Sequence, residues 1–190
     1  MGITSPIHPM EDFTEPQKEK INLTLIANPP DIDDSKFERV VTYLRTLAPP
    51  AQRNANDPSV KRGDILFNKI GCSKCHIPTL RTGSDAAIDE LKNQPIKPYT
   101  DLLLHDMGEG LADGIQDSLA SGSEWRTPPL WGIGLTKTVN GNTFFLHDGR
   151  ARSIEEAILW HGGEGSESRK NYSSLSLDDK DDLLNFINSL

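Results

Sequence analysis

Residues 72–76 read Cys72-Ser73-Lys74-Cys75-His76, and this string contains both cysteines of the 190-residue chain. Two thiols with this spacing lie about one helical turn apart, so they can add to the two vinyl groups of one porphyrin. The histidine that follows then lies under the ring, where its imidazole can bind the iron. The motif therefore predicts one covalent haem c, attached to Cys72 and Cys75 and ligated by His76.

Three other interpretations of the cysteine pair stay open. A thioredoxin-type redox pair needs a strand before the motif, whereas the residues before this one have the pattern of an amphipathic helix. A zinc site needs two further ligands at metal-like spacing, and the candidates His105, His147 and His161 are scattered along the chain. The third alternative is a local disulfide between Cys72 and Cys75.

The composition limits the classes of function. Hydrophobic residues make up 35% of the chain, and 15 Gly and 13 Pro predict much loop and a core that a bound group could complete. The net charge of −8 argues against nucleic acid or an anionic membrane as the main partner. No apolar run approaches the roughly 18 residues of a membrane span. Residues 1–10 lack the basic and apolar regions of a signal peptide, so we expect none there.

Apolar residues at helical spacing predict a mainly α chain. Ser35 with Glu38, and Ser153 with Glu156, have the spacing of capping boxes, and Asp57-Pro58 is typical of a helix start. The expected helices cover residues 35–47, 58–70, 154–161 and 177–188. In the first of them, the apolar residues fall on one face; they are Phe37, Val40, Val41, Leu44 and Leu47.

The remaining segments are expected to be mostly irregular. Residues 1–30 are interpreted as an extended N-terminal arm with a short strand at 23–26, and residues 31–190 as one domain. Residues 77–142 are expected to be loop apart from a helical turn within 127–134, and a short strand is expected at 143–146. A structureless segment of that length is unusual in a compact domain unless it wraps around a bound group.

Two pairs of residues indicate how the helices pack. Gly63 and Phe67 lie on one face of the helix before the motif, and Leu183 and Phe186 lie on one face of the last helix. This arrangement resembles the crossing of the first and last helices in the cytochrome c fold, where a glycine permits close backbone approach. We therefore expect a mainly α cytochrome c fold with a long loop that wraps the haem.

Longer strings carry a family resemblance, and with the haem motif they are similar to those of the bacterial di-haem oxidoreductases. That family is also described as peroxidases or thiol oxidoreductases, and it is related to the di-haem cytochrome c peroxidases. The resemblance covers roughly residues 35–190. The strings are PYTDLLLHDMG at 98–108, EWRTPPLWG at 124–132, LHDGRAR at 146–152 and EEAILWHGG at 155–163.

The resemblance implies a part of a larger assembly. Such proteins carry two haem motifs in two cytochrome c domains, whereas this chain has one motif and looks like the C-terminal domain. In the relatives that domain holds the six-coordinate electron-transfer haem, and peroxide reacts at the haem of the other domain. The implied partner is a second haem domain or a redox protein. The implied location is periplasmic or otherwise extracytoplasmic, because haem c is attached outside the cytoplasm.

The resemblance also suggests the second axial ligand. In the relatives this ligand is Met or Tyr and follows the His-Asp-Gly histidine by fourteen residues, and the same count from His147 leads to His161. His161 ends an amphipathic helix just before Gly162-Gly163. Met107, which lies in a glycine-bounded loop, is the alternative ligand, and another residue or none remains open.

Further side chains are candidates for the haem surroundings. Haem propionates need planar cationic donors, which Arg126, Arg150 and Arg152 could supply. The three tryptophans are expected to be pocket or core residues; they are Trp125, Trp131 and Trp160.

The function expected from these features is electron transfer through a c-type haem. One alternative is an oxidoreductase of the peroxidase type with its own activity, and another is a small metal-binding or redox-thiol module.

Overall fold

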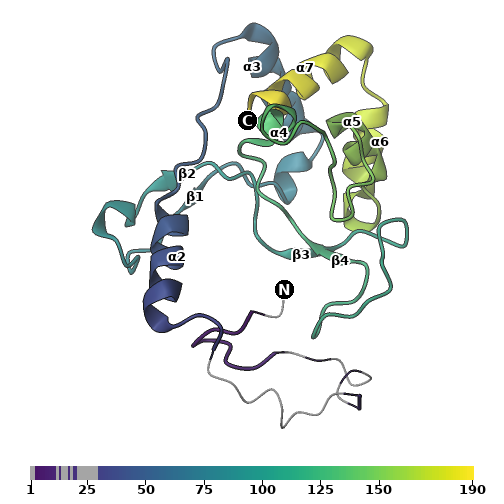
Figure 1. Ribbon diagram of the computed structural model, residues 1–190. Helices are drawn as coiled ribbons and strands as arrows, with labels where there is room; N and C mark the ends of the chain where they lie inside the picture. The colour runs from purple at the N-terminus through teal and green to yellow at the C-terminus, as the bar shows by residue number, and fades with distance from the viewer. Residues whose placement is uncertain (1–2, 12, 14–16, 18, 21–29) are drawn as a thin grey trace. The chain divides into compact units, whose positions relative to one another are not determined.

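A computed structural model describes residues 3–11, 13, 17, 19–20 and 30–190 (Figure 1). The chain consists of two compact units, Met1–Ala48 and Pro49–Leu190. The short strand predicted at residues 23–26, and more than half of the predicted arm, lie outside the described residues. The described elements are mainly α-helical, as the sequence predicts.

The first unit contains one described α-helix, α2 (Asp34–Thr46). Its N-cap is Asp33, whose carboxylate accepts a hydrogen bond from the Lys36 amide at 2.9 Å. The prediction of a capping box on Ser35 was therefore wrong, because an aspartate two residues earlier satisfies the first turn. No residue of α2 is buried.

The second unit begins with the helix that leads to the cysteines, α3 (Pro58–Lys69). The Asp57 side chain accepts from the Ser59 amide at 2.7 Å, and Pro58 occupies the first turn, where its missing N–H costs nothing. Gly71 follows with a φ of 96°, a left-handed conformation that glycine adopts without strain. The chain therefore turns sharply just before Cys72, as the sequence predicts.

Short elements occupy the segment expected to be loop. Strands β1 (Leu80–Arg81) and β2 (Pro95–Ile96) pair antiparallel, as do β3 (Leu104–Asp106) and β4 (Glu124–Arg126). The helical turn predicted at 127–134 is found only at its end, where residues 133 and 134 begin the 3-10 helix η4 (Ile133–Leu135). The predicted strand at 143–146 is reduced to a single bridge between Phe145 and Ala151. The other elements before the last helices are η2 (Cys72–Lys74), η3 (Asp89–Leu91) and α4 (Thr136–Asn140).

The C-terminal part is helical. It contains α5 (Ile154–Trp160), η5 (Gly163–Gly165), α6 (Ser166–Ser173) and α7 (Leu177–Ser189). The Ser153 hydroxyl accepts from the Glu156 amide at 3.0 Å, which confirms the predicted cap of α5. The sequence did not reveal α6, because its residues are polar and only Tyr172 is buried.

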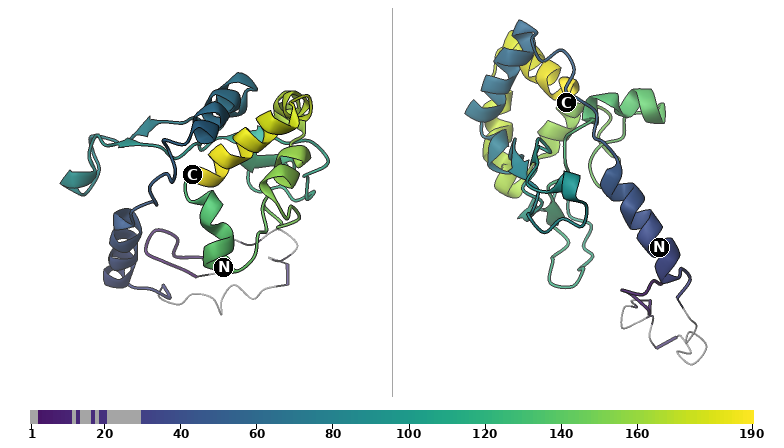
Figure 2. Two further views of the ribbon diagram at one scale, coloured as in Figure 1. Left: turned by 90° about the horizontal axis from the view of Figure 1, so that it is seen from above. Right: turned by 90° about the vertical axis from the view of Figure 1, so that its left-hand side faces the viewer.

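Helices α3 and α7 cross at very short range, side by side in all three views (Figures 1 and 2). A Cβ atom at Gly63 would lie 2.1 Å from the Asp182 carbonyl oxygen and 2.5 Å from the Phe186 Cβ atom. Beside this contact, Arg62 Nε donates to the Asp182 carboxylate at 2.6 Å. The crossing predicted at Gly63 is therefore confirmed, with the Asp182 backbone rather than Leu183 as the nearest neighbour.

Aromatic rings extend this crossing towards the cysteine motif. Phe67 of α3 contacts Phe186 of α7 with ring centroids 5.3 Å apart, and both contact Tyr99 edge-on at 5.9 and 5.8 Å. Such edge-to-face pairs stabilise a core beyond the area that they bury. The main core cluster consists of Val60, Leu66, Phe67, Ile70, Tyr99, Leu130, Ile154, Tyr172, Leu183, Phe186, Ile187 and Leu190.

The crossing makes a prediction about stability. Gly63→Ala should lower the free energy of unfolding by about 1–3 kcal/mol, because the added methyl group meets backbone atoms that cannot move aside. At an open helix position the same change would instead stabilise by about 1 kcal/mol. Urea denaturation measures the sign of the effect. Gly110→Ala is a control, since the nearest atom to its Cβ would be 3.9 Å away. A stabilised Gly63→Ala protein would contradict the close crossing.

Candidate functional site

The cysteine motif follows α3 as one tight turn. The amide of Cys75 donates to the Cys72 carbonyl within η2, and the His76 amide donates to the same oxygen at 3.0 Å. The two thiols are half-buried and are not joined to each other. Cys72 packs against the core cluster. The two sulfur-bearing residues thus lie one turn apart, the separation that the haem interpretation requires.

His76 is oriented by a backbone hydrogen bond. Its Nδ1 atom lies 3.0 Å from the Tyr99 carbonyl oxygen, which can only accept, so Nδ1 carries the hydrogen. The lone pair of the neutral ring is then on Nε2, for which no hydrogen-bond partner is found among the described residues. Burial lowers the pKa of His76 to about 4, so the ring is neutral at pH 7 and Nε2 can bind a metal.

Tyr99 has an unusual backbone conformation. Its φ is 53°, in the left-handed region that a bulky residue rarely adopts. Its ring is buried between Phe67 and Phe186, which holds the residue in place. The packing therefore maintains a strained backbone whose carbonyl points at His76.

His161 repeats the arrangement of His76. It follows α5, and its Nδ1 atom donates to the Ala157 carbonyl at 2.8 Å, which again leaves the lone pair on Nε2. Burial lowers the pKa of His161, and His161 in turn helps to lower the pKa of His76, so the two imidazoles are close enough to interact. The tertiary structure thus brings together two neutral rings that are far apart in the sequence.

Met107 lies beside His161. A Cβ atom at Gly165 would be 3.3 Å from the Met107 methyl carbon and 3.2 Å from a ring carbon of His161. The structure therefore brings both candidates for the second axial ligand to the same place.

The two thiols have high pKa values. Burial raises the pKa of Cys72 to about 12. Burial also raises the pKa of Cys75, and the carboxylates of Asp101 and Glu164 raise it further. A redox-active pair needs a thiolate near neutral pH, so these surroundings disfavour thioredoxin-type chemistry.

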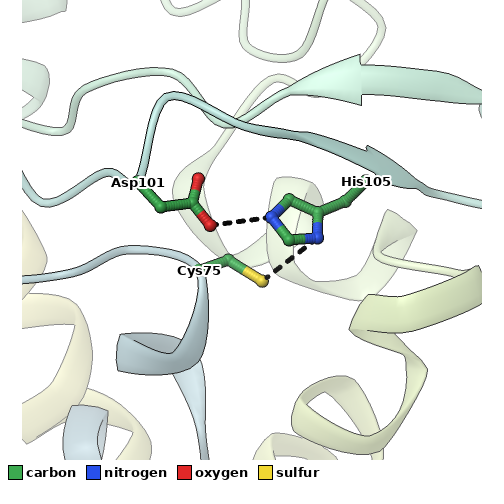
Figure 3. A group of neighbouring side chains, drawn as sticks. All are labelled: Cys75, Asp101 and His105. Atoms are coloured by element: carbon green, nitrogen blue, oxygen red, sulfur yellow. Dashed lines mark hydrogen bonds and ion pairs between the residues drawn. The ribbon is translucent and has the colours of Figure 1, made fainter. Parts of the chain in front are cut away.

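Two titratable side chains, Asp101 and His105, lie beside Cys75 (Figure 3). His105 lies between the carboxylate of Asp101, 2.8 Å from its Nε2, and the sulfur of Cys75, 3.8 Å from its Nδ1. Among the residues described, these three are the only group of His, Cys and acidic side chains with the spacing of a metal site. Nδ1 also lies 2.8 Å from Glu164, so both ring nitrogens face carboxylates. A protonated ring satisfies both contacts but has no lone pair for zinc.

The three candidate arginines differ in their surroundings. Arg150 donates to Asp148 at 2.6 Å, and its guanidinium lies over the Trp160 ring, 4.7 Å from the ring centre. Arg152 is exposed, with Glu156 at 4.0 Å. Arg126 is exposed on β4. Their contact with propionates stays a prediction.

Two of the tryptophans make polar or stacking contacts. Trp125 stacks on His147 with ring centroids 3.6 Å apart and donates from Nε1 to the Leu111 carbonyl at 3.1 Å. Trp160 is partly exposed beneath Arg150. His147 therefore stacks on an aromatic ring in the loop, whereas His161 lies near His76.

Comparison with known proteins identifies the family. A family model described as "Di-haem oxidoreductase, putative peroxidase" matches residues 26–190. The chain belongs to the di-haem oxidoreductase family. No curated protein and no solved structure gave a match. Family membership assigns a redox function that uses haem. The family name implies two haems, whereas this di-haem oxidoreductase chain contains one Cys-x-x-Cys-His motif.

Some residues of the candidate site were not foreseen from the sequence. The Tyr99 carbonyl acts through the backbone, which no sequence pattern reports. Asp101 and His105 are four residues apart in a quoted string, and this spacing was a detectable signal. The sequence contains no comparable signal for Glu164. In the part of the chain that the structure describes, no helix is long and apolar enough to cross a membrane.

The contacts of His105 make a prediction about pH. Hydrogen bonds to Glu164 and then Asp101 raise the pKa of His105 above its ordinary value of about 6.5. This pairing therefore stabilises the fold fully below that value, and its contribution is lost as the pH rises through the folded-state pKa. In a histidine NMR titration, Glu164→Gln should lower the pKa of His105. Glu167→Gln, on a side chain that reaches Lys74 instead, should leave it unchanged. An unaltered titration in both variants would refute the contact.

Proposed function

We propose that this chain is an electron-transfer domain with one covalent haem c on Cys72 and Cys75, ligated by His76 and His161. One observation carries the proposal: two neutral imidazoles lie near each other, each with Nδ1 bonded to a backbone carbonyl and Nε2 available. Imidazole nitrogen is a common iron ligand, and two free thiols adjoin one of the rings. The residues present therefore fit the group that the family implies.

The packing within the second unit supports a cytochrome c fold for that part of the predicted domain, which was expected to cover residues 31–190. The glycine-mediated crossing of α3 and α7 lies next to the motif, as that fold requires. The segment 77–142 contains both the carbonyl that orients His76 and the alternative ligand Met107. We infer that this segment wraps the haem.

When bound, the haem supplies one-electron redox chemistry. The chain's own residues attach it, orient it and exclude water. Cys72 and Cys75 fix one orientation, and the hydrogen bond from His76 to Tyr99 holds the ring and raises its basicity as a ligand. The low pKa values show that the surroundings of both imidazoles disfavour charge, which also influences the reduction potential.

Two axial histidines favour electron transfer over peroxide chemistry. A sixth ligand from the protein leaves no open coordination position, so the peroxidase alternative requires that His161 does not bind. We further propose that Arg126, Arg150 and Arg152 supply contacts to the haem propionates. Of these side chains, Arg126 is exposed and Arg150 already pairs with Asp148.

The family name supports the proposal for the partner. A di-haem family with one haem motif in this chain implies a second haem domain or redox protein as the exchange partner. The chain then corresponds to the C-terminal part of the assembly. Covalent haem attachment makes an extracytoplasmic location part of the same proposal.

Covalent attachment can be tested by extraction. Protein produced with cytochrome maturation machinery should keep its haem in acidified acetone, because thioether bonds survive this treatment. Replacing both Cys72 and Cys75 by Ala should release the haem into the organic phase. Haem that extracts from the unmutated protein would refute the attachment.

Ligation can be tested by two matched variants. His161→Ala should convert ferric iron from low-spin to high-spin and open it to cyanide, whereas Met107→Ala should leave the spectrum unchanged. Electron paramagnetic resonance and visible spectra measure both effects. A far-red thioether–iron band that disappears in Met107→Ala would assign Met107 instead. High-spin iron in the unmutated protein would exclude both ligands and favour the peroxidase alternative.

A further inference from the structure

Three charged side chains form a continuous bridge that the proposed electron-transfer function does not use. Asp101 Oδ2 and His105 Nε2 are 2.8 Å apart, and His105 Nδ1 and Glu164 Oε2 are also 2.8 Å apart. The second oxygen of Glu164 accepts from the Asp106 amide at 3.0 Å. We refer to Asp101, His105 and Glu164 as the carboxylate–histidine bridge. Figure 3 shows its first half, next to Cys75.

One end of the bridge lies close in sequence to Tyr99, which orients His76, and the other end lies close to His161. Asp101 follows Tyr99 by two residues, and the Tyr99 carbonyl binds Nδ1 of His76. Glu164 follows His161 by three residues, in the turn η5. The bridge therefore joins the segment that orients one imidazole to the turn that follows the other.

The turn after His161 packs on the segment around Met107 through glycines. A Cβ atom at Gly162 would lie 2.6 Å from the Met107 carbonyl oxygen, and one at Gly108 would lie 2.9 Å from the Gly163 nitrogen. Such backbone packing permits close approach but has little directional preference. Among the described residues, the hydrogen bonds between 101–108 and 161–165 are the two that Glu164 accepts.

The inner part of the bridge is buried, and its outer end is more exposed. The Asp101 side chain is 7% exposed and that of His105 is 16% exposed, whereas the Glu164 side chain is 55% exposed. Hydrogen bonds between charged groups are the stronger ones, and their effect is largest where water is partly excluded. By comparison, Glu167 lies three residues further along and is 74% exposed, with Lys74 at 3.5 Å.

We propose that Glu164 is a positioning residue, which acts through His105 and Asp101 to hold His161 near His76. This inference rests on the proposed function, because it concerns how two ligands of one iron are held. Without the Glu164 carboxylate, the turn after His161 keeps its glycine packing but loses both directional bonds to β3. His161 then leaves the iron more often, and external ligands compete with it more easily.

The test uses the haem-loaded protein in its ferric state. Glu164→Ala should bind cyanide about tenfold more tightly than the unmutated protein, since a charge-assisted hydrogen bond contributes about that factor to an equilibrium. Its resonance spectrum should also show a high-spin component. The cyanide affinity of Glu164→Gln should lie between those of the unmutated protein and Glu164→Ala, because an amide oxygen can still accept a hydrogen bond from the Asp106 amide. Glu167→Gln is the matched control and should behave as the unmutated protein does.

The possible outcomes distinguish a failure of this inference from a failure of the proposed function. If the unmutated protein is low-spin and Glu164→Ala matches it in spin state and cyanide affinity, the positioning role is wrong and the ligation stands. If the unmutated protein lacks low-spin iron, the ligation is wrong and the positioning role falls with it. Should Glu164→Ala fail to retain haem, Glu164→Gln decides by the same measurements, since it keeps the size of the side chain.

Discussion

The close approach of α3 and α7 at Gly63 is the contact on which the site depends. Because no side chain separates the backbones there, Phe67 and Phe186 meet directly and form a surface for Tyr99. That surface holds Tyr99 in a left-handed backbone conformation, from which its carbonyl reaches His76. The helix crossing at Gly63 thus contributes to the orientation of the histidine in the motif.

The histidines of this chain illustrate how surroundings select chemistry. His76 and His161 each donate one hydrogen bond to a backbone carbonyl and are buried, so they stay neutral and keep a lone pair. His105 lies between two carboxylates, which favour its charged form. The same side chain is therefore a candidate ligand in two places and a structural cation in a third.

The cysteines lead to a similar conclusion. Their raised pKa values oppose thiolate formation, and one of them adjoins carboxylates that increase the effect. Thiols in such surroundings are poorly suited to disulfide exchange, whereas attachment to a haem requires chiefly their spacing. Family membership and local electrostatics therefore favour the same interpretation over the redox-thiol alternative.

Local patterns in the sequence determined much of the second unit. The caps at Asp57 and Ser153, the stop at Gly71, the spacing of Cys72 and Cys75, and the packing role of Gly63 all depend on neighbours or on one helix face. The start of the helix in the first unit was predicted less well, since Asp33 rather than Ser35 caps α2. Helix α6 was missed because its polar residues carry no amphipathic signal. The spacing from His147 had already suggested His161 as the partner of His76, but only the tertiary structure decided that Tyr99 supplies the orienting carbonyl and that Glu164 reaches His105. These two contacts join residues that are 23 and 59 positions apart, and they involve a backbone atom or a single charge, for which sequence spacing contains no information.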